Sequence, residues 1–454
     1  MQKTIYYIML FMLCCANMHA SKIAYSSNDD RFQLENPQII LDLSTTTSHI
    51  PFIRRGEWKQ EKQPIFSANF AIQNSLPKHF LPLQVESAWE TARTKVFHTA
   101  QFTGLTANGV KLLWKFDLHR ERPIIRQQTN IHNPTQKAIQ VPWYPIFQGI
   151  WATPSNKAWI RWWDSLHYTR HQEFLSSTPI KLGSYMQSSD VRYSASNKEQ
   201  PGTLPYWMIG HPRGRILFGL AWTGGWKTTI KGEENSAQIF THLPAEETQL
   251  TLQPGETING PILHIYCTRE TDDNQARKAF MRQRQALAQE LYGGPQPSLP
   301  LVWNHWYSCR FDFDREYFLK QADAMTPYGF DYFVVDAGWY KGMGEWIPDP
   351  QKFKPGELES GLREISDNGI PVGIWSCPQY VSDPDHPHVD DPPFYRKFIG
   401  GYLLDMAGMD FSTYLKNHVR SLREQFYIDW WKYDQDFFVA ETRHGIMKNV
   451  IALQ

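Results

Sequence analysis

The sequence lacks an excess of charge of either sign. Its 454 residues include 46 Lys and Arg against 46 Asp and Glu, so the formal net charge is zero. A protein that binds nucleic acid or an anionic membrane surface usually carries a strongly basic region. We therefore expect neither of these as the main partner.

Cysteine is also scarce. Of the five cysteines, Cys14 and Cys15 lie in the N-terminal segment, and the remainder of the chain holds Cys267, Cys309 and Cys377. An odd and low number of cysteines does not build a disulfide framework, even in an oxidising compartment. We therefore expect hydrophobic cores to stabilise the fold.

Long apolar runs are missing as well. The first residues, MQKTIYYIMLFMLCCANMHASK, combine a cation at Lys3, an apolar stretch from Ile5 to about Ala16, and a small residue at Ala20. This pattern is typical of a secretory signal peptide, and the stretch is shorter than the roughly 20 residues of a membrane span. We predict a signal peptide over residues 1–20, export to the periplasm or the extracellular space, and no membrane span.

Motifs for cofactors and metals are equally lacking. No glycine-rich loop of the phosphate-binding kind follows a predicted strand, and no cysteines and histidines stand at ligand spacing. Segment 383–391, DPDHPHVDD, has two histidines and four aspartates, but its two prolines favour a solvated loop. We expect no metal, nucleotide or flavin site.

Aromatic residues, in contrast, are abundant: 18 Trp, 21 Tyr and 26 Phe. They can fill large cores, or they can line a groove for a ligand with flat apolar faces, such as a sugar ring. Composition alone favours the core interpretation.

The pattern of predicted secondary structure changes near residue 293. Over residues 21–292, short alternating or β-branched runs such as IILDLS, VKLLWKFDL and ILHIYCT are separated by turn residues, which predicts a large antiparallel β-sandwich. Residues 273–291 carry apolar residues at helical spacing and close this domain with a helix. The Gly/Pro-rich segment 293–300 is the predicted linker.

Strands and helices alternate from residue 301 onward. Predicted strands at 301–308, 331–340, 371–378 and 429–436 are separated by predicted helices, which is typical of a parallel sheet covered on both faces. We count four βα units, whereas a complete (β/α)8 barrel typically needs about 250 residues. The interpretation is a partial TIM barrel over 301–454, with about the first four units present.

Polar and aromatic side chains gather at the ends of these strands. Examples are Trp306 on the first strand, Asp336 on the second, Trp375 on the third, and Lys432 and Asp434 on the fourth. Active sites of parallel βα folds form where the carboxyl ends of the strands meet, so these side chains are expected to converge. Lys432 and Asp434 lie on the same side of their strand, and a purely structural ion pair between them remains a serious alternative.

The second half of the chain resembles the melibiase-type α-galactosidases, glycoside hydrolase family 36 of clan D. The family signatures V-x-D-D/A-G-W-F/Y and K-W/Y-D stand here as VVDAGWY and KYD, at residues 334–340 and 432–434. Segment 344–356, GEWIPDPQKFKPG, resembles the family loop G-D-W-x-x-D-x-x-K-F-P-x-G, and PVGIW at 371–375 resembles its third strand. The N-terminal sandwich resembles the usual companion domain more loosely.

The resemblance implies a role for individual residues. Asp434 would be the nucleophile and Lys432 a ligand of sugar hydroxyls, while Asp336 would bind the 4- and 6-hydroxyls of galactose. Trp306 and Trp375 would line the subsite. The other two substrate-binding candidates, Trp339 and Trp346, are expected to form its supporting wall.

Three departures from the family pattern bear on these roles. Ala337 replaces a frequent second aspartate, and Trp375 is followed by SCPQ in place of an acidic W-x-E-P motif. The family's acid/base aspartate comes from the sixth strand, and the chain ends after the fourth, so no residue here is assigned that role.

Several functions therefore stay open. The leading hypothesis is an exported retaining α-galactosidase that acts on galactose-containing oligosaccharides without a cofactor. Alternatives are a raffinose-synthase-like galactosyltransferase, an α-N-acetylgalactosaminidase, and a truncated, catalytically inactive fragment that binds carbohydrate. The sequence leaves open the linkage, the substrate length and whether the protein is an oligomer.

Overall fold

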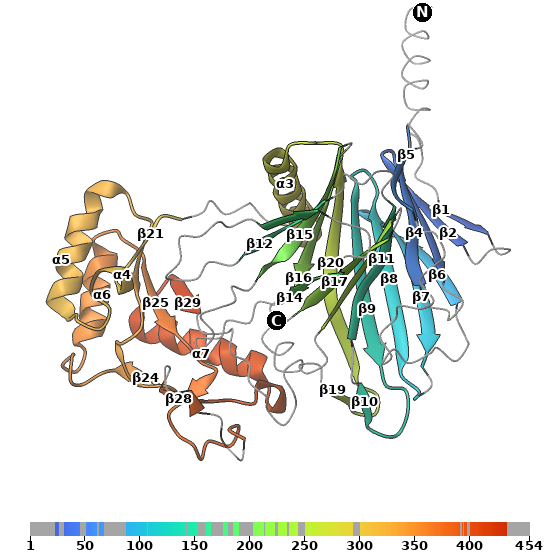
Figure 1. Cartoon of the computed structure of the whole chain (residues 1–454). Helices are drawn as coiled ribbons and strands as arrows, with labels where there is room; N and C mark the ends of the chain where they lie inside the picture. The colour runs from blue at the N-terminus through green and yellow to red at the C-terminus, as the bar shows by residue number, and fades with distance from the viewer. Residues whose placement is uncertain are drawn as a thin grey trace, which may run out of the picture. The chain divides into compact units, whose positions relative to one another are not determined.

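The structure of the chain is a computed structural model, shown in Figure 1. The residues it describes are 23–26, 31–45, 51–60, 63–67, 88–106, 108–141, 144–152, 159–164, 176–179, 185–189, 203–212, 214–222, 226–233, 236–243, 250–293, 300–390, 393, 395–396 and 400–433. The predicted signal peptide over 1–20 and the candidate nucleophile Asp434 lie outside these ranges. The chain divides into two compact units, Met1–Pro295 and Gln296–Gln454, and this division falls within the segment predicted as a linker.

The first unit contains a nine-stranded sheet in the order β1-β2-β3-β4-β11-β18-β17-β14, with β5 paired to β4. Its strands are β1 (Ile23–Ser26), β2 (Arg31–Glu35), β3 (Ile39–Thr45), β4 (Pro51–Trp58), β5 (Gln63–Ser67), β11 (Tyr144–Ala152), β14 (Tyr185–Ser189), β17 (Lys227–Glu233) and β18 (Ser236–Leu243). All pairs are antiparallel except β4 with β11.

A second nine-stranded sheet has the order β13-β12-β15-β16-β20-β9-β8-β7-β6 and is antiparallel throughout. Its strands are β6 (Ala88–Arg93), β7 (Phe97–Leu105), β8 (Lys111–His119), β9 (Ile124–His132), β12 (Trp159–Asp164), β13 (Ser176–Pro179), β15 (Thr203–His211), β16 (Gly214–Ala221) and β20 (Thr257–Thr268). A small ladder of β10 (Ile139–Val141) and β19 (Leu250–Leu252) lies beside them. The predicted runs IILDLS, VKLLWKFDL and ILHIYCT coincide with β3, β8 and β20.

Alternation explains how these strands bury one face. In β8 the apolar side chains of Leu112, Trp114, Phe116 and Leu118 are all buried, and the intervening positions include Lys115 and Asp117. A pattern that repeats every two residues is typical of a strand whose two faces lie in different environments. The core of the unit thus follows from the sequence pattern.

Helix α3 (Asp273–Tyr292) begins where the predicted closing helix begins. The Asp272 carboxylate accepts a hydrogen bond from the Gln275 N–H and caps the first turn. On the buried face, Phe280 packs over Gly219 of β16, where an added Cβ would lie 2.8 Å from the ring. Only a glycine lets the helix approach the sheet this closely.

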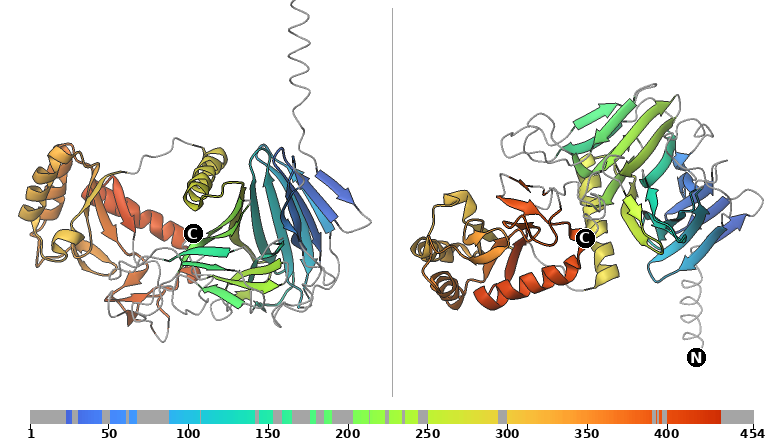
Figure 2. Two further views of the ribbon diagram at one scale, coloured as in Figure 1. Left: turned by 45° about the horizontal axis from the view of Figure 1, so that its top comes forward. Right: turned by 90° about the horizontal axis from the view of Figure 1, so that it is seen from below.

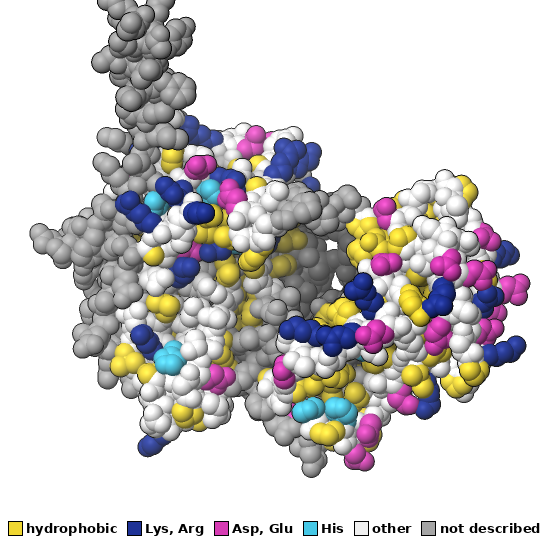
Figure 3. Space-filling model, turned by 180° about the vertical axis from the view of Figure 1, so that it is seen from behind, with side chains coloured by type: hydrophobic (Ala, Val, Ile, Leu, Met, Phe, Trp, Pro, Cys, Tyr) yellow, Lys and Arg dark blue, Asp and Glu magenta, His cyan; other side chains and the backbone are white. Residues whose placement is uncertain are grey.

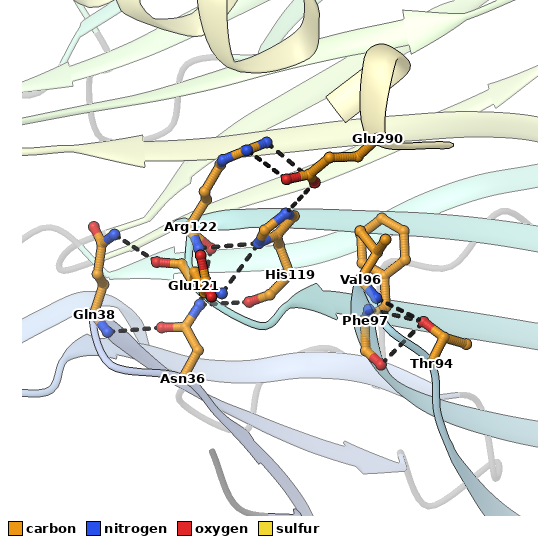
Figure 4. A network of polar contacts seen from close by, with 9 residues as sticks. All are labelled: Asn36, Gln38, Thr94, Val96, Phe97, His119, Glu121, Arg122 and Glu290. Carbon is orange, nitrogen blue, oxygen red and sulfur yellow. Dashed lines mark hydrogen bonds and ion pairs between the residues drawn. The ribbon is translucent and has the colours of Figure 1, made fainter. Parts of the chain in front are cut away.

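A polar network joins two turns of the first unit, as Figure 4 shows. Asn36 follows β2, is fully buried, and donates from Nδ2 to the carbonyl oxygens of His119 and Arg122, each 2.8 Å away. Its Oδ1 accepts from the backbone N–H groups of Gln38 and Ile39. One side chain therefore meets four backbone groups from segments far apart in the sequence.

The same network reaches helix α3. Glu290 accepts hydrogen bonds from Arg122 through both oxygens and also contacts His119 Nε2 at 2.9 Å. The end of the helix is thereby tied to the turn between β8 and β9.

The second unit contains a parallel sheet in chain order: β21 (Val302–Asn304), β22 (Tyr332–Val335), β25 (Val372–Ser376) and β29 (Trp430–Tyr433). The helices are α4 (Trp306–Cys309), α5 (Arg315–Met325), the 3-10 turn η2 (Thr326–Tyr328), α6 (Glu357–Asp367), the 3-10 turn η3 (Met406–Gly408) and α7 (Phe411–Phe426). Figures 1 and 2 show α5, α6 and α7 beside the sheet. The predicted alternation of strands and helices is confirmed for these residues.

The core of this unit lies between the sheet and the helices. Phe333 and Val335 of β22 and Val372 and Ile374 of β25 pack against buried side chains of α5, α6 and α7. Alternation places the other residues of each strand on the opposite face, which includes Asn304, Gly373 and Lys432. The polar groups at the strand ends are thus separated from the helix-side core.

Two predicted strands are shorter than expected. The run 301–308 is a strand only to Asn304, because the Asn304 Oδ1 accepts the Trp306 N–H and bends the chain into the short helix α4. The run 331–340 ends at Val335, and Gly338 follows with φ +100, a backbone conformation that ends the strand.

Two small sheets after the parallel strands were not predicted. They are the hairpin of β23 (Tyr340–Gly342) and β24 (Glu345–Pro348), and a three-stranded sheet of β26 (Tyr380–Val381), β28 (Gly401–Leu403) and β27 (Tyr395–Arg396). Strands this short carry too few residues to show a period in the sequence.

The surface agrees with the balanced composition. On the face of the second unit seen in Figure 3, acidic and basic side chains are interspersed. Among the described helices, none has the length and apolar character needed to cross a bilayer.

Candidate active site

The candidate site centres on Asp336, the residue after β22. The residue is 3% exposed. Its carboxylate accepts three hydrogen bonds: from the Ala337 N–H to Oδ1 at 2.7 Å, and from Asn304 Nδ2 and Lys432 Nζ to Oδ2 at 2.6 and 2.5 Å. A carboxylate has about four acceptor positions, two on each oxygen. Oδ1 therefore keeps one position for a hydroxyl group of a ligand.

The partners of Asp336 come from two other strands. Asn304 ends β21, and Lys432 lies in β29, beyond β25 in the strand order. Three carboxyl ends of parallel strands thus contribute to one polar cluster, as expected for a βα fold. The predicted convergence of Asp336 and Lys432 is confirmed.

Gly373 of β25 keeps the neighbouring strands close on this face. A Cβ at this position would lie 2.8 Å from Trp430 Cβ and 3.0 Å from Val334 Cγ2. Any larger residue would push Trp430 away and shift Lys432, two residues later in the same strand.

His305 holds the backbone of Asp336 in place. Its ring is fully buried, Nδ1 accepts the Asp336 N–H at 2.8 Å, and Nε2 donates to the Arg310 carbonyl at 2.9 Å. Burial lowers the pKa of His305 to about 4, against a smaller opposing effect of the Asp336 carboxylate. The neutral ring with its proton on Nε2 fits both partners.

The receiving carbonyl belongs to a residue with unusual backbone geometry. Arg310 follows α4 with φ 55 and ψ −107, a region that non-glycine residues rarely adopt. Outliers of this kind persist where surrounding contacts hold them, and they cluster at functional sites. Here the contact is the hydrogen bond from His305.

The candidate tryptophans differ in exposure. Trp306 is half-buried, with its ring edge-on to Phe311 at 5.0 Å. Trp375, expected to line the subsite, is only 2% exposed, and its ring stacks on Tyr340 at 5.5 Å. Among the described residues, Trp306 thus offers a sugar more surface than Trp375.

The two supporting tryptophans pack behind the strand ends. Trp339 is fully buried and donates from Nε1 to the Trp375 carbonyl at 2.9 Å. Trp346 of β24 is half-buried and lies 6.2 Å from Trp339 and 6.1 Å from Trp375, ring centre to ring centre. These contacts are those of packing residues.

Two features were missed by the sequence analysis. Neither Asn304 nor His305 was assigned a role. The alternation of β21 could have indicated Asn304, because Val302 and Asn304 share a face. Nothing in the sequence indicates that the His305 ring binds the Asp336 backbone.

A match to a known family covers this part of the chain. Residues 261–450 match the Melibiase family. These residues thus resemble a melibiase domain. The chain is similar to α-galactosidases over half of its length or somewhat more, and to this extent it is glycoside hydrolase-like.

Individual relatives agree with the melibiase domain. The chain is 22% identical over 270 residues to the probable α-galactosidase G of Aspergillus terreus and 23% identical over 245 residues to an α-galactosidase of Escherichia coli. The aligned segments cover 52% and 50% of this chain but only 37% and 34% of those proteins. The chain thus matches about a third of the length of these curated relatives.

Solved structures show a similar fold. The α-galactosidase of Lactobacillus brevis superposes with a TM-score of 0.72 at 16% identity, covering 95% of this chain and 68% of that one. The family 36 α-galactosidase AgaA of Geobacillus stearothermophilus gives 0.68 at 14% identity, covering 93% and 69%. At such identities the likeness establishes the fold alone.

Proposed function

We propose that this protein is a retaining α-galactosidase that releases terminal α-linked galactose from oligosaccharides. The observation that carries the proposal is the cluster of Asp336, Asn304 and Lys432, whose hydrogen bonds leave Oδ1 of Asp336 an acceptor position for a sugar hydroxyl. Variants of one α-galactosidase of similar fold, AgaA of Geobacillus stearothermophilus, have been crystallised with stachyose and with raffinose, which supports a galactose-containing oligosaccharide as substrate.

The architecture belongs to the same proposal. We propose that the two nine-stranded sheets of the first unit form a β-sandwich, and that the four parallel strands of the second are the first part of a (β/α)8 barrel; the strand orders support both. The predicted signal peptide supports export as part of the proposal.

Asp434 is the proposed nucleophile. It follows β29 directly, and alternation along an extended strand would place it on the same face as Lys432. In the reaction, a carboxylate oxygen of Asp434 bonds to the anomeric carbon as the bond to the leaving oxygen breaks, and water later cleaves the glycosyl ester. A second carboxyl group must protonate the leaving oxygen, and the sequence offers no residue that we can assign to this step.

Asp336 and Lys432 would bind the sugar in this mechanism. The Asp336 carboxylate accepts hydroxyl hydrogen bonds, and the Lys432 ammonium donates them, so together they orient the ring for attack. Trp306 would supply an apolar surface for the C–H face of the sugar.

The proposal is tested with dinitrophenyl α-galactoside and the purified 454-residue chain. Dinitrophenolate leaves without protonation, so the assay reports on the nucleophile and the sugar site without requiring the acid. We expect a burst of dinitrophenolate from the wild type and none from Asp434→Asn. Equal slow release from both proteins would contradict the assignment of Asp434 and support the interpretation as an inactive fragment.

The alternative enzymes give different results in the same assay. An α-N-acetylgalactosaminidase would prefer the N-acetylated aryl glycoside, and a galactosyltransferase would transfer galactose to added sucrose. The departure from the family after Trp375 is the reason to include both substrates.

A further inference from the structure

Three side chains from three elements meet on the helix side of the parallel sheet, behind the candidate site. Trp431 of β29 donates from Nε1 to Ser376 Oγ at 2.7 Å, and Ser376 Oγ lies 2.7 Å from His418 Nε2. Ser376 ends β25 and is fully buried, and His418 lies in α7. A polar chain thus links two strands and a helix, with Ser376 fully buried and with His418 and Trp431 half-buried.

The direction of one of these hydrogen bonds is fixed by chemistry. An indole N–H can only donate, so Ser376 Oγ accepts from Trp431. The direction of the bond between Ser376 Oγ and His418 Nε2 depends on the tautomer of the ring, and Nε2 accepts the serine proton when it carries none itself. Burial lowers the pKa of His418 to about 4, so the ring is neutral near pH 7 and can act as the acceptor.

The surroundings of His418 reinforce this arrangement. The rings of Trp346 and Trp431 lie edge-on to it at 5.4 and 6.1 Å. Tyr414, one turn earlier in α7, is neutral near pH 7, and burial raises its pKa further, to about 12. The side chains that contact the His418 ring, those of Trp346, Ser376 and Trp431, carry no charge at that pH.

The consequence for the site follows from strand geometry. Successive side chains of a strand point to opposite faces, so holding Trp431 on the helix side directs Lys432 to the other face. There Lys432 must reach past β25 to contact Asp336. A small rotation or shift of the four-residue strand β29 would take Nζ out of hydrogen-bonding range.

We propose that Ser376, His418 and Trp431 form a clamp that positions Lys432 on Asp336. Ser376 and His418 are positioning residues, since the hydrogen bonds of their side chains lead to Trp431 and the Lys432 side chain bonds Asp336. The effect of the clamp on sugar binding rests on the proposed function, whereas its effect on the Lys432 contact does not.

The first test measures the position of Lys432 without any sugar. The rate at which acetic anhydride acetylates Lys432 at pH 7.5 is followed by peptide mass spectrometry, because an ammonium bound to a carboxylate reacts slowly. We expect Ser376→Ala and His418→Phe to raise this rate several-fold. Ser382→Ala is the matched control, since its hydroxyl bonds the Met343 carbonyl and lies outside the clamp.

A conservative variant separates positioning from general destabilisation. In His418→Gln the side-chain amide reaches about as far as Nε2 and offers an oxygen to the Ser376 hydroxyl, so acetylation should stay at the wild-type rate. The proposal is overturned if Ser376→Ala leaves the rate for Lys432 unchanged, or if His418→Gln raises it as much as His418→Phe. It is also overturned if all lysines of the second unit react faster to the same degree.

The second test measures galactose binding by isothermal titration calorimetry. Misplacing a positioned group by about 1 Å can cost up to about 100-fold, and we expect Ser376→Ala to weaken binding on the order of tenfold. The same substitution in a Lys432→Met background should have almost no effect, because the clamp acts through Lys432. An equal loss in both backgrounds would overturn the proposal. A wild type that binds no galactose would contradict the proposed function, while the acetylation result would still decide on the clamp.

Discussion

Lys432 hydrogen-bonds Asp336 although a complete strand lies between them. Nζ of Lys432 in β29 is 2.5 Å from Oδ2 of Asp336, and β25 separates the two in the sheet. The Asp336 side chain is 4% exposed and that of Lys432 30%. Burying a charged carboxylate to this degree costs free energy unless the carboxylate has hydrogen-bonding or charged partners. The pair therefore affects the stability of the folded protein as well as the proposed sugar site.

Removing the cation should destabilise the protein. We expect Lys432→Met to lower the free energy of unfolding by about 2–3 kcal/mol, somewhat less than for a fully buried pair, because Asp336 keeps only neutral donors. Urea denaturation measures this loss. The control Lys341→Met removes an exposed pair with Glu345 and should cost less than about 1 kcal/mol.

The double variant Lys432→Met/Asp336→Asn tests the cause of that loss. If the uncompensated carboxylate is responsible, removing its charge should restore part of the stability. Strictly additive losses would show that the two residues do not interact.

His305 should make the protein sensitive to acid. Its pKa is about 4 in the folded state and about 6.5 in the unfolded chain, so the unfolded state binds the proton more readily. Its contribution to stability is complete above about pH 6.5 and is lost as the pH falls toward 4. The total loss for this group is up to roughly 3 kcal/mol.

Urea midpoints between pH 7.5 and pH 4 test this prediction. The variant His305→Asn keeps an acceptor for the Asp336 N–H but cannot be protonated, so its stability should fall less steeply below pH 6.5. His264 and His418, whose pKa values are lowered to about 3 and about 4, act in the same direction and remain in the variant. A variant with the wild-type slope would show that His305 is not buried as a neutral ring.

Asn36 should be essential for the stability of the first unit. Asn36→Ala leaves the buried Ile39 N–H, the part-buried Gln38 N–H and two carbonyls without this partner, and we expect a loss of about 2–4 kcal/mol. The matched control is Gln38→Ala, because Gln38 bonds the Glu121 carbonyl at the exposed edge of the same network. Thermal unfolding followed by circular dichroism compares the two, and equal effects would contradict the central role of Asn36.

The thiols should differ in reactivity. Cys309 is half-buried, whereas Cys267 and Cys377 are fully buried, and burial raises the pKa of the Cys267 thiol. Iodoacetamide should therefore label Cys309 first in the native protein and the other two only in urea, as read by peptide mass spectrometry. Rapid native labelling of Cys267 would contradict the buried position of β20.

Much of the second unit could be predicted because its elements are regular. A helix was expected between the predicted strands 371–378 and 429–436, and α7 spans Phe411–Phe426 there. Its apolar residues have helical spacing, and Asp410 caps it through the Thr413 N–H. The convergence of Asp336 and Lys432 followed from a general rule about parallel strands. Patterns within single segments of the sequence were sufficient to predict these features.

Contacts across strands could not be predicted in the same way. The sequence suggested Asp434 as the partner of Lys432 because the two lie two residues apart, and that contact remains a prediction, since Asp434 lies outside the described residues. The bond to Asp336 depends on strand order and on the space that Gly373 leaves. The burial of Trp375 depends on Tyr340 and on a hairpin too short to show in the sequence.

The position of β20 has a consequence for synthesis on the ribosome. This strand pairs with β16 on one side and β9 on the other, yet it is the last strand of its sheet to be made. Until residues 222–268 have emerged, the sheet exists as two separate halves, each with an open edge. Open edges invite pairing with other chains. The risk of aggregation should therefore be highest in the seconds before β20 joins the two halves of the sheet. The rate at which β20 pairs with β9 and β16 should then matter more for the yield of folded protein than the stability of the folded state.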